Sequence, residues 1–277
     1  MQLHARAMIS PRRRLSQHFL RNSAIAHRIA QALNAGQQDT VLEIGAGTGA
    51  LTRHLVTMPA RQVIAVEIDH RAVSVLRDEL GSVTHLRIVE GDIRSLELDQ
   101  LDISDGSRLI AVGNIPYHLT GPILFWLYER TDRICRIVLM VQKEVAARIV
   151  AQPGSKTYGI LSVATALVAQ RAQVLFDVSP SAFHPRPEVT SSVVAIDSNG
   201  VSLRSDANRR TMQLVKAAFQ QRRKKLRNAL ERYVQSLVGA FPPMLEQLPL
   251  MHCRAEQVSP QQFQWLASFL DTLAQRQ

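Results

Sequence analysis

The apolar residues between positions 40 and 141 are grouped in short runs that alternate with stretches of helical spacing. The runs are rich in Val, Ile and Leu, as expected for strands that are buried on both faces. One intervening stretch, residues 71–80, has helical periodicity and ends at Gly81. We predict strands at residues 40–44, 62–68, 85–89, 109–113 and 136–141.

This alternation predicts an α/β fold with a doubly wound, mostly parallel sheet and helices on both of its faces. Ligands of such sheets bind outside the carboxyl ends of the strands. Residues 174–178 and 190–196 indicate a further, antiparallel pair of strands at one edge. Beyond residue 200 the pattern becomes helical and is interrupted at Phe241-Pro242-Pro243. We therefore expect two domains, residues 1–199 and a small all-helical domain of residues 200–277.

Positive charge is concentrated at the two ends of the chain, which has 277 residues and a net charge of +10. Residues 1–40 carry six Arg and one acid, and residues 200–277 carry twelve basic and five acidic residues. The part between them is close to neutral. Two basic ends favour a polyanionic partner such as nucleic acid. The alternative is a set of solvated charged faces.

Composition and termini narrow the class of protein. No apolar run is long enough to cross a membrane. Cys135 and Cys253 lie far apart and lack metal-ligand spacing, which indicates a reducing compartment, no disulfide and no metal site. The Arg-rich start has no signal-peptide core and could serve as an organelle transit segment. Since the first motif begins near residue 15, we favour a basic tail on a cytoplasmic protein.

A glycine-rich loop follows the first predicted strand. In residues 43–49, the glycines let the backbone turn sharply and approach a ligand closely. Glu67, at the end of the second strand, occupies the place of the acid that holds a ribose in nucleotide-binding folds. Up to this point the pattern also fits a dinucleotide-binding protein.

Two further acids favour another cofactor. Glu43 places negative charge beside the glycine loop, which is unfavourable for a pyrophosphate and suitable for an ammonium group. Asp92, after the third strand, can accept a hydrogen bond from an adenine amine. These features indicate an adenosine that carries an amino acid and no phosphates, which is S-adenosyl-methionine.

The segment Asn114-Ile115-Pro116-Tyr117, here called the NIPY segment, ends the fourth strand. The Asn114 side-chain oxygen and the Ile115 carbonyl can each accept one N–H of a planar amine, because Pro116 has no N–H and interrupts regular pairing. The Tyr117 ring can stack on the base that carries the amine. The alternative is an ordinary strand end whose tyrosine packs in the core.

These motifs together resemble those of class I methyltransferases, which have a Rossmann-like fold and act on adenine N6. Further segments resemble the ribosomal RNA adenine dimethyltransferases, namely LSQHFL at 15–20, QKEVA at 142–146, KTYGILSV at 156–163, FHPRPEV at 183–189, QRRKKLRN at 221–228 and RAEQVS at 254–259. The last two resemble the small-subunit, kasugamycin-sensitivity methylases. The macrolide-resistance methylases of the large subunit match less well there.

The resemblance implies two successive N6 methylations on each of two adjacent adenosines near the 3′ end of small-subunit ribosomal RNA. The target base leaves its stack, and Phe183 is expected to sandwich it with Tyr117. Many family members have Asn at the position of His18, whose imidazole can also donate or accept one hydrogen bond. The expected cofactor-binding residues are Gln17, His18, Leu20, Gly45, Gly47, Glu67, Ile68, Asp92 and Asn114.

Two basic clusters are candidates for RNA binding. We expect the second cluster to lie on one helix with Phe219, Leu226 and Leu230 as its buried stripe. A solvated basic face is the alternative reading of this cluster. The candidates are Arg12, Arg13, Arg14, Arg222, Arg223, Lys224, Lys225 and Arg227. We expect a monomer that binds the small-subunit precursor and needs no metal. The alternatives are a large-subunit or DNA adenine methylase and a non-catalytic ribosome-assembly or transcription factor.

Overall fold

The computed structural model describes residues 18–103 and 106–275. Arg12, Arg13, Arg14 and Gln17 therefore lie outside the described residues. The chain forms two compact units. The first comprises Met1–Leu127, Arg133–Ala146 and Gln173–Ser198, and the second comprises Tyr128–Asp132, Ala147–Ala172 and Asn199–Gln277.

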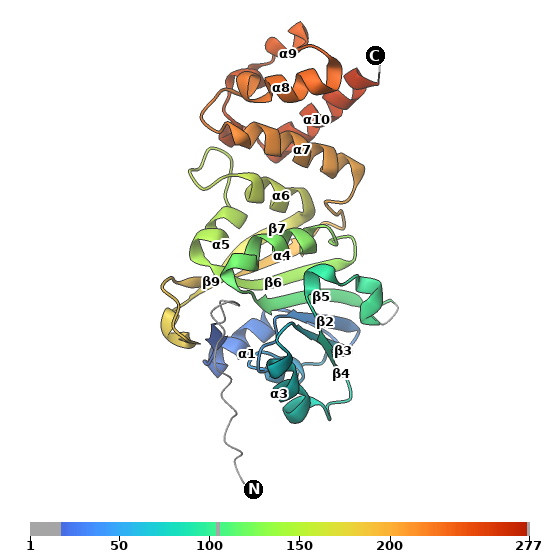
Figure 1. Cartoon of the computed structure of the whole chain (residues 1–277), viewed down its shortest axis with the longest axis vertical. Coiled ribbons are helices and arrows are strands. Elements are labelled where there is room, and N and C mark those ends of the chain that lie inside the picture. Colours follow the sequence, from blue (N-terminus) through green and yellow to red (C-terminus); the bar gives the residue numbers. More distant parts are fainter. Residues whose placement is uncertain (1–17, 104–105, 276–277) are drawn as a thin grey trace. The chain divides into compact units, whose positions relative to one another are not determined.

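A seven-stranded sheet has the order β4-β3-β2-β5-β6-β9-β7 (Figure 1). Its strands are β2 (Asp39–Ile44), β3 (Gln62–Glu67), β4 (Leu86–Glu90), β5 (Arg108–Asn114), β6 (Ile134–Gln142), β7 (Ala169–Val178) and β9 (Ser191–Ser198). Strands β2 to β6 pair in parallel, and β9 pairs antiparallel with β6. The predicted doubly wound, mostly parallel sheet is thus confirmed.

Continuous burial explains why these strands form. Every residue of β2 is buried, and β5 is buried from Leu109 to Gly113, so both faces of these central strands are covered. The helices of this part are α1 (Ser23–Gln31), α2 (Thr52–Leu55), α3 (His70–Leu80), α4 (Thr120–Tyr128) and α5 (Lys143–Ile149). Helix α3 packs against β3 and β4.

Two very short strands, β1 (Phe19–Leu20) and β8 (Phe183–His184), form a separate antiparallel pair. This pair joins the beginning of the described chain to a segment more than 160 residues later. Two residues are too few to show an alternating pattern, so these strands could not be predicted from the sequence. The short 3₁₀ turns are Ile93–Ser95, Leu98–Leu101, Tyr117–Leu119, Pro180–Ala182, Pro249–His252 and Ala255–Gln257.

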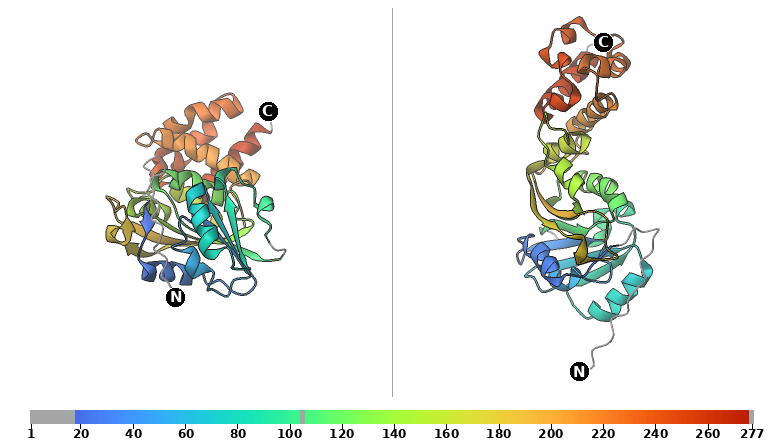
Figure 2. Two further views of the ribbon diagram at one scale, coloured as in Figure 1. Left: turned by 60° about the horizontal axis from the view of Figure 1, so that its bottom comes forward. Right: turned by 90° about the vertical axis from the view of Figure 1, so that its left-hand side faces the viewer.

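The second unit is mainly helical (Figure 2, orange to red for residues 199–277). It contains α6 (Ile160–Val168), α7 (Asp206–Gln220), α8 (Leu226–Val238), α9 (Pro243–Glu246) and α10 (Pro260–Ala274), with α7 packed against α8 and α10. Within the described ranges, no helix combines the length and the apolar character that a membrane span requires.

The prediction of one helix through the second basic cluster is wrong. Helix α7 ends at Gln220, residues 221–225 form a turn, and α8 starts at Leu226. The Leu226 amide donates to the Cys253 carbonyl at 2.7 Å, a tertiary hydrogen bond that takes the place of helical pairing. The predicted buried positions Leu226 and Leu230 are nevertheless fully buried.

Candidate active site at the carboxyl ends of the parallel strands

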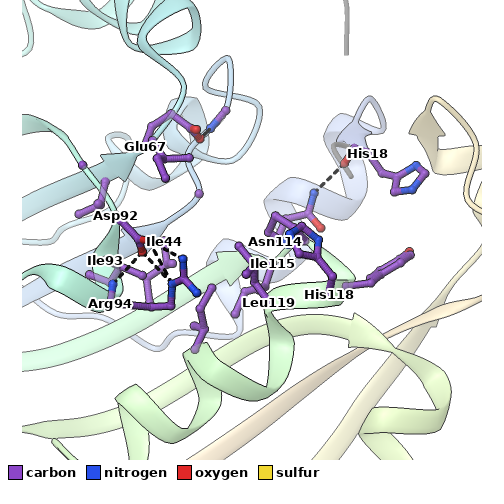
Figure 3. A pocket seen from close by; sticks show the side chains of 18 of the residues that line it. His18, Ile44, Glu67, Asp92, Ile93, Arg94, Asn114, Ile115, His118 and Leu119 are labelled. Carbon is purple, nitrogen blue, oxygen red and sulfur yellow. Dashed lines mark hydrogen bonds and ion pairs between the residues drawn. The ribbon is translucent and has the colours of Figure 1, made fainter. Parts of the chain in front are cut away.

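A cavity opens where β2, β3, β4 and β5 end (Figure 3). We call it the first cavity; its volume is about 200 Å³. In the sheet, β2 lies between β3 and β5, so the connections diverge at this point, where doubly wound folds bind ligands. Predicted site residues that line it are His18, Gly45, Gly47, Glu67, Ile68, Asp92, Asn114, Ile115, Pro116 and Tyr117.

The glycine loop forms one wall of this cavity. Gly45 and Gly47 have φ angles of +73° and +55°, a region that favours glycine. A Cβ atom on Gly47 would lie 3.3 Å from the Phe19 ring. The Gly47 amide donates to Glu67 Oε2 at 2.7 Å, so the loop is tied to the end of β3.

Glu67 is held in a fixed orientation. Its other oxygen accepts from the Asp69 amide at 2.8 Å, and the residue is only 5% exposed. Burial raises the pKa of this carboxyl, and the backbone hydrogen bonds partly oppose that effect. The next residue, Ile68, is 49% exposed and adds an apolar surface to the first cavity. A carboxylate beside an apolar face suits a nucleoside, with its ribose hydroxyls and flat base.

Asp92 has a partner that the sequence analysis missed. Its two oxygens accept from the Arg94 guanidinium at 2.6–3.1 Å, and Oδ1 also accepts from the Arg94 amide at 3.0 Å. These bonds lower the pKa of Asp92, chiefly through the side-chain hydrogen bond. Arg94 also lines the first cavity. The signal was present in the sequence as an acid and an arginine two residues apart.

The orientation of the Asn114 amide is set by the residue that precedes the strand β1. Its Nδ2 donates to the His18 carbonyl at 3.0 Å, which leaves Oδ1 as an acceptor (Figure 3). The preceding residue must be glycine, because a Cβ atom on Gly113 would lie 2.6 Å from the Ile44 carbonyl oxygen. The close approach of β2 and β5 thereby fixes the position from which Asn114 extends.

Tyr117 is tethered at both its ring and its hydroxyl. The hydroxyl hydrogen-bonds to Ser191 Oγ at 2.8 Å, and the ring stacks on His18 with centroids 5.5 Å apart. His18 Nδ1 in turn donates to the Pro185 carbonyl at 2.8 Å. Burial raises the pKa of the Tyr117 hydroxyl, which stays neutral.

Three predicted residues, Leu20, Phe183 and Glu43, are not among the described residues that line the first cavity. Phe183 is 5% exposed and lies in the hydrophobic core, paired in register with Leu20. Its place beside the target base stays a prediction. Glu43 is 1% exposed and accepts from Thr52 Oγ1 at 2.7 Å. Burial raises the pKa of Glu43 to about 7.

The second basic cluster divides into two kinds of residue. Arg222 donates to Glu256 and to the Lys156 carbonyl, both at 2.7 Å. Arg227 pairs with Glu231 and Glu246. Arg223, Lys224 and Lys225 are exposed. Two arginines of the cluster therefore support the fold of the second unit, and three cations face solvent.

The residues around the first cavity fit S-adenosyl-methionine. Gly45 and Gly47 have no side chains that would fill the space beside the loop backbone. Glu67 can accept from ribose hydroxyls, Ile68 can contact the adenine, and Asp92 can accept from its amine. Two acids and one arginine line the cavity, a balance that suits a cofactor with a sulfonium and an ammonium group.

Comparisons with known proteins agree with this assignment. The family model described as "Ribosomal RNA adenine dimethylase" matches residues 8–261. A "Ribosomal RNA small subunit methyltransferase A" from Methylococcus capsulatus is 42% identical over 221 residues, covering 80% of this chain and 84% of the relative. A protein of the same name from Salinibacter ruber is 41% identical over 273 residues, covering 95% and 86%.

Solved structures show the same architecture. A dimethyladenosine transferase from Plasmodium falciparum matches with a TM-score of 0.76 and 26% identity, covering 92% of this chain and 98% of the other. The 23S rRNA methyltransferase ErmE matches with a TM-score of 0.63 and 25% identity, covering 91% and 99%. Since the family model and these relatives match most of its length, the chain belongs to the ribosomal RNA adenine dimethylase family.

Proposed function

We propose that this protein transfers methyl groups from S-adenosyl-methionine to N6 of two adjacent adenosines near the 3′ end of small-subunit ribosomal RNA. The observation that carries the proposal is the orientation of Asn114. With Nδ2 engaged by the His18 carbonyl, Oδ1 is the atom that can accept from an incoming amine. The relatives named as small-subunit methyltransferases support the choice of RNA.

The chain contributes alignment to this reaction. S-adenosyl-methionine supplies a methyl group already activated on a sulfonium. The N6 lone pair of adenine is delocalised into the ring, so the amine must be turned before it can attack. Asn114 Oδ1 and the Ile115 carbonyl accept its two N–H groups, and the Tyr117 ring supports the base. Holding the two reactants in this way supplies most of the acceleration without a strong base.

The RNA contacts that we propose involve the second unit. Arg223, Lys224 and Lys225 in the turn between α7 and α8 are exposed and suited to phosphates of folded RNA. Arg12, Arg13 and Arg14, outside the described residues, are further candidates. Residues 200–277 would thus serve as the RNA-binding domain of a cytoplasmic monomer. Light scattering tests the oligomeric state and should give the mass of one chain, 30.9 kDa.

A large-subunit methylase is the second candidate, since the ErmE structure matches over most of this chain. The test is incubation with labelled S-adenosyl-methionine and unmethylated small or large ribosomal subunits in separate reactions. We expect label in small-subunit RNA, recovered as N6,N6-dimethyladenosine at two adjacent positions. Label in large-subunit RNA alone would support the second candidate. No label in either RNA would indicate a non-catalytic assembly factor.

A further inference from the structure

A second cavity lies in the first unit, beside the first. Its volume is about 490 Å³, and Phe19 contributes to the lining of both cavities. The strand β1 contains Phe19, and the residue just before it, His18, supplies the carbonyl that orients Asn114. The two cavities are therefore separated by the strand that positions the proposed catalytic amide.

The charges of the two cavities differ in sign. Arg21, Arg53, His54 and His184 line the second cavity. Among the described residues, the one acid in its lining is Glu79, which forms an ion pair with Arg53. The first cavity is lined by two acids and one arginine. A cationic cofactor suits the first cavity, and an anionic ligand suits the second.

His54 lies beside other basic side chains at the second cavity. Its ring lies 5.7 Å from that of His27, and its Nε2 hydrogen-bonds to Ser23 Oγ at 3.0 Å. Burial lowers the pKa of His54 first, and the nearby His27 and Arg53 lower it further. The lowered pKa favours the neutral imidazole, so His54 can offer a hydrogen bond to phosphate while the arginines supply the positive charge.

We infer that the second cavity binds the sugar–phosphate backbone of the RNA next to the target adenosine. The arginines and imidazoles would contact phosphate, and the apolar wall that includes Phe19 and Leu20 would contact ribose. This inference rests on the proposed function, because a strand that delivers a base to the NIPY segment brings its neighbouring phosphates close to β1. The alternative anionic ligand of the second cavity is the carboxylate of the cofactor.

The experiment compares Arg21→Gln with Arg61→Gln. Both residues are exposed in the first unit, but Arg61 precedes β3 at the opposite, amino end of the sheet. The probes are a short single-stranded oligoribonucleotide and S-adenosyl-homocysteine. Binding of a short oligoribonucleotide does not depend on which ribosomal subunit is the substrate. A failure of this inference can therefore be distinguished from a failure of the proposed function, which the methylation assay tests. Melting temperatures check that both variants fold.

We expect Arg21→Gln to weaken RNA binding about fivefold at low salt and to reduce the slope of log K against log salt by about 0.7. Arg61→Gln should leave both quantities unchanged, and neither variant should change the affinity for S-adenosyl-homocysteine. Equal RNA binding by the two variants would overturn the inference. Weaker S-adenosyl-homocysteine binding by Arg21→Gln with unchanged RNA binding would assign the cavity to the cofactor carboxylate instead.

Discussion

Acidic residues near the cofactor cavity have distinct environments, although the sequence suggested similar ligand contacts for them. Glu67 and Asp92 line the first cavity, and each is oriented by hydrogen bonds from neighbouring residues. Glu43 is buried in β2 and bonds to Thr52. The spacing of the acids predicted that they belong to one region. It could not predict which carboxyl would face the cavity, because that depends on the direction in which each strand residue points.

Glu43 should make the protein less stable as the pH rises. Its folded pKa of about 7 exceeds the ordinary value of 4.5, so the native state binds more protons than the unfolded state between these values. The loss of folding stability caused by Glu43 is absent below pH 4.5 and complete above about pH 7. Glu43→Gln keeps an acceptor for Thr52 and removes the titration. Its stability relative to the wild type should increase from pH 5 to pH 8 by up to about 3 kcal/mol.

Urea unfolding at the two pH values measures this effect. Thr57→Val, a substitution at a hydroxyl that donates to the His54 carbonyl, offers a non-titrating control. A Glu43→Gln variant whose relative stability is the same at both pH values would contradict the assignment of a raised pKa.

Asp92 should recognise the adenine amine of the cofactor. Asp92→Asn removes a charged acceptor, and hydrogen bonds to charged groups contribute about 1.5–3 kcal/mol. We expect at least tenfold weaker binding of S-adenosyl-homocysteine, measured by calorimetry. An analogue with hydrogen in place of the amine should bind both proteins with similar affinity. Glu90→Gln, at the exposed end of β4 and two residues before Asp92, is the matched control. Equal losses for both ligands would exclude this role.

Among the secondary-structure elements, the long strands of the main sheet were predicted from the sequence, whereas the short pair β1–β8 was not. Long apolar runs have a periodicity that identifies them, and β2, β3 and β5 were found within two residues of their ends. The pair of β1 and β8 has no such signal, because two residues form no pattern. This pair positions His18 and, through it, Asn114. The predicted site was therefore recognised by residue type, whereas its support is visible only in the fold.

The turn between α7 and α8 provides a second case. Helical spacing continued through the basic cluster, but tertiary hydrogen bonds interrupt the helix there. Arg222 joins this turn to Glu256, and the Glu256 carbonyl also accepts from the Gly154 amide at 2.7 Å. The sequence treated all cations of the cluster alike, because charge alone does not distinguish a paired arginine from an exposed one.

Variants of this turn should separate structural cations from RNA-binding cations. Arg222→Gln should lower the melting temperature, because the Lys156 carbonyl and Glu256 lose their donor. Replacing Arg223, Lys224 and Lys225 together by Gln should leave the melting temperature unchanged. The triple variant should bind RNA more weakly and reduce the salt slope by about 2. An unchanged slope would return these three residues to the solvated-face interpretation.

For the whole molecule, positive charge is concentrated in the C-terminal residues, whereas the lining of the first cavity is more acidic than basic. Residues 200–277 carry twelve basic and five acidic residues, while the first cavity, within the first unit, is lined by two acids and one arginine. Composition predicted a polyanionic partner from this asymmetry. It could not predict the second, basic cavity, whose lining comes from β1, α1, α2, α3 and β8. Residues that are distant in sequence create that local charge.

The most direct test of the account is the effect of Asn114→Ala on methyl transfer. Single-turnover methylation of unmethylated small subunits is measured together with the affinities for S-adenosyl-homocysteine and RNA. We expect a rate about 10²–10³-fold lower, as for loss of one oriented transition-state contact, with RNA affinity retained and cofactor affinity reduced less than tenfold. A parallel loss of RNA affinity and rate, or a rate close to that of the wild type, would contradict the claim that Asn114 orients the target amine.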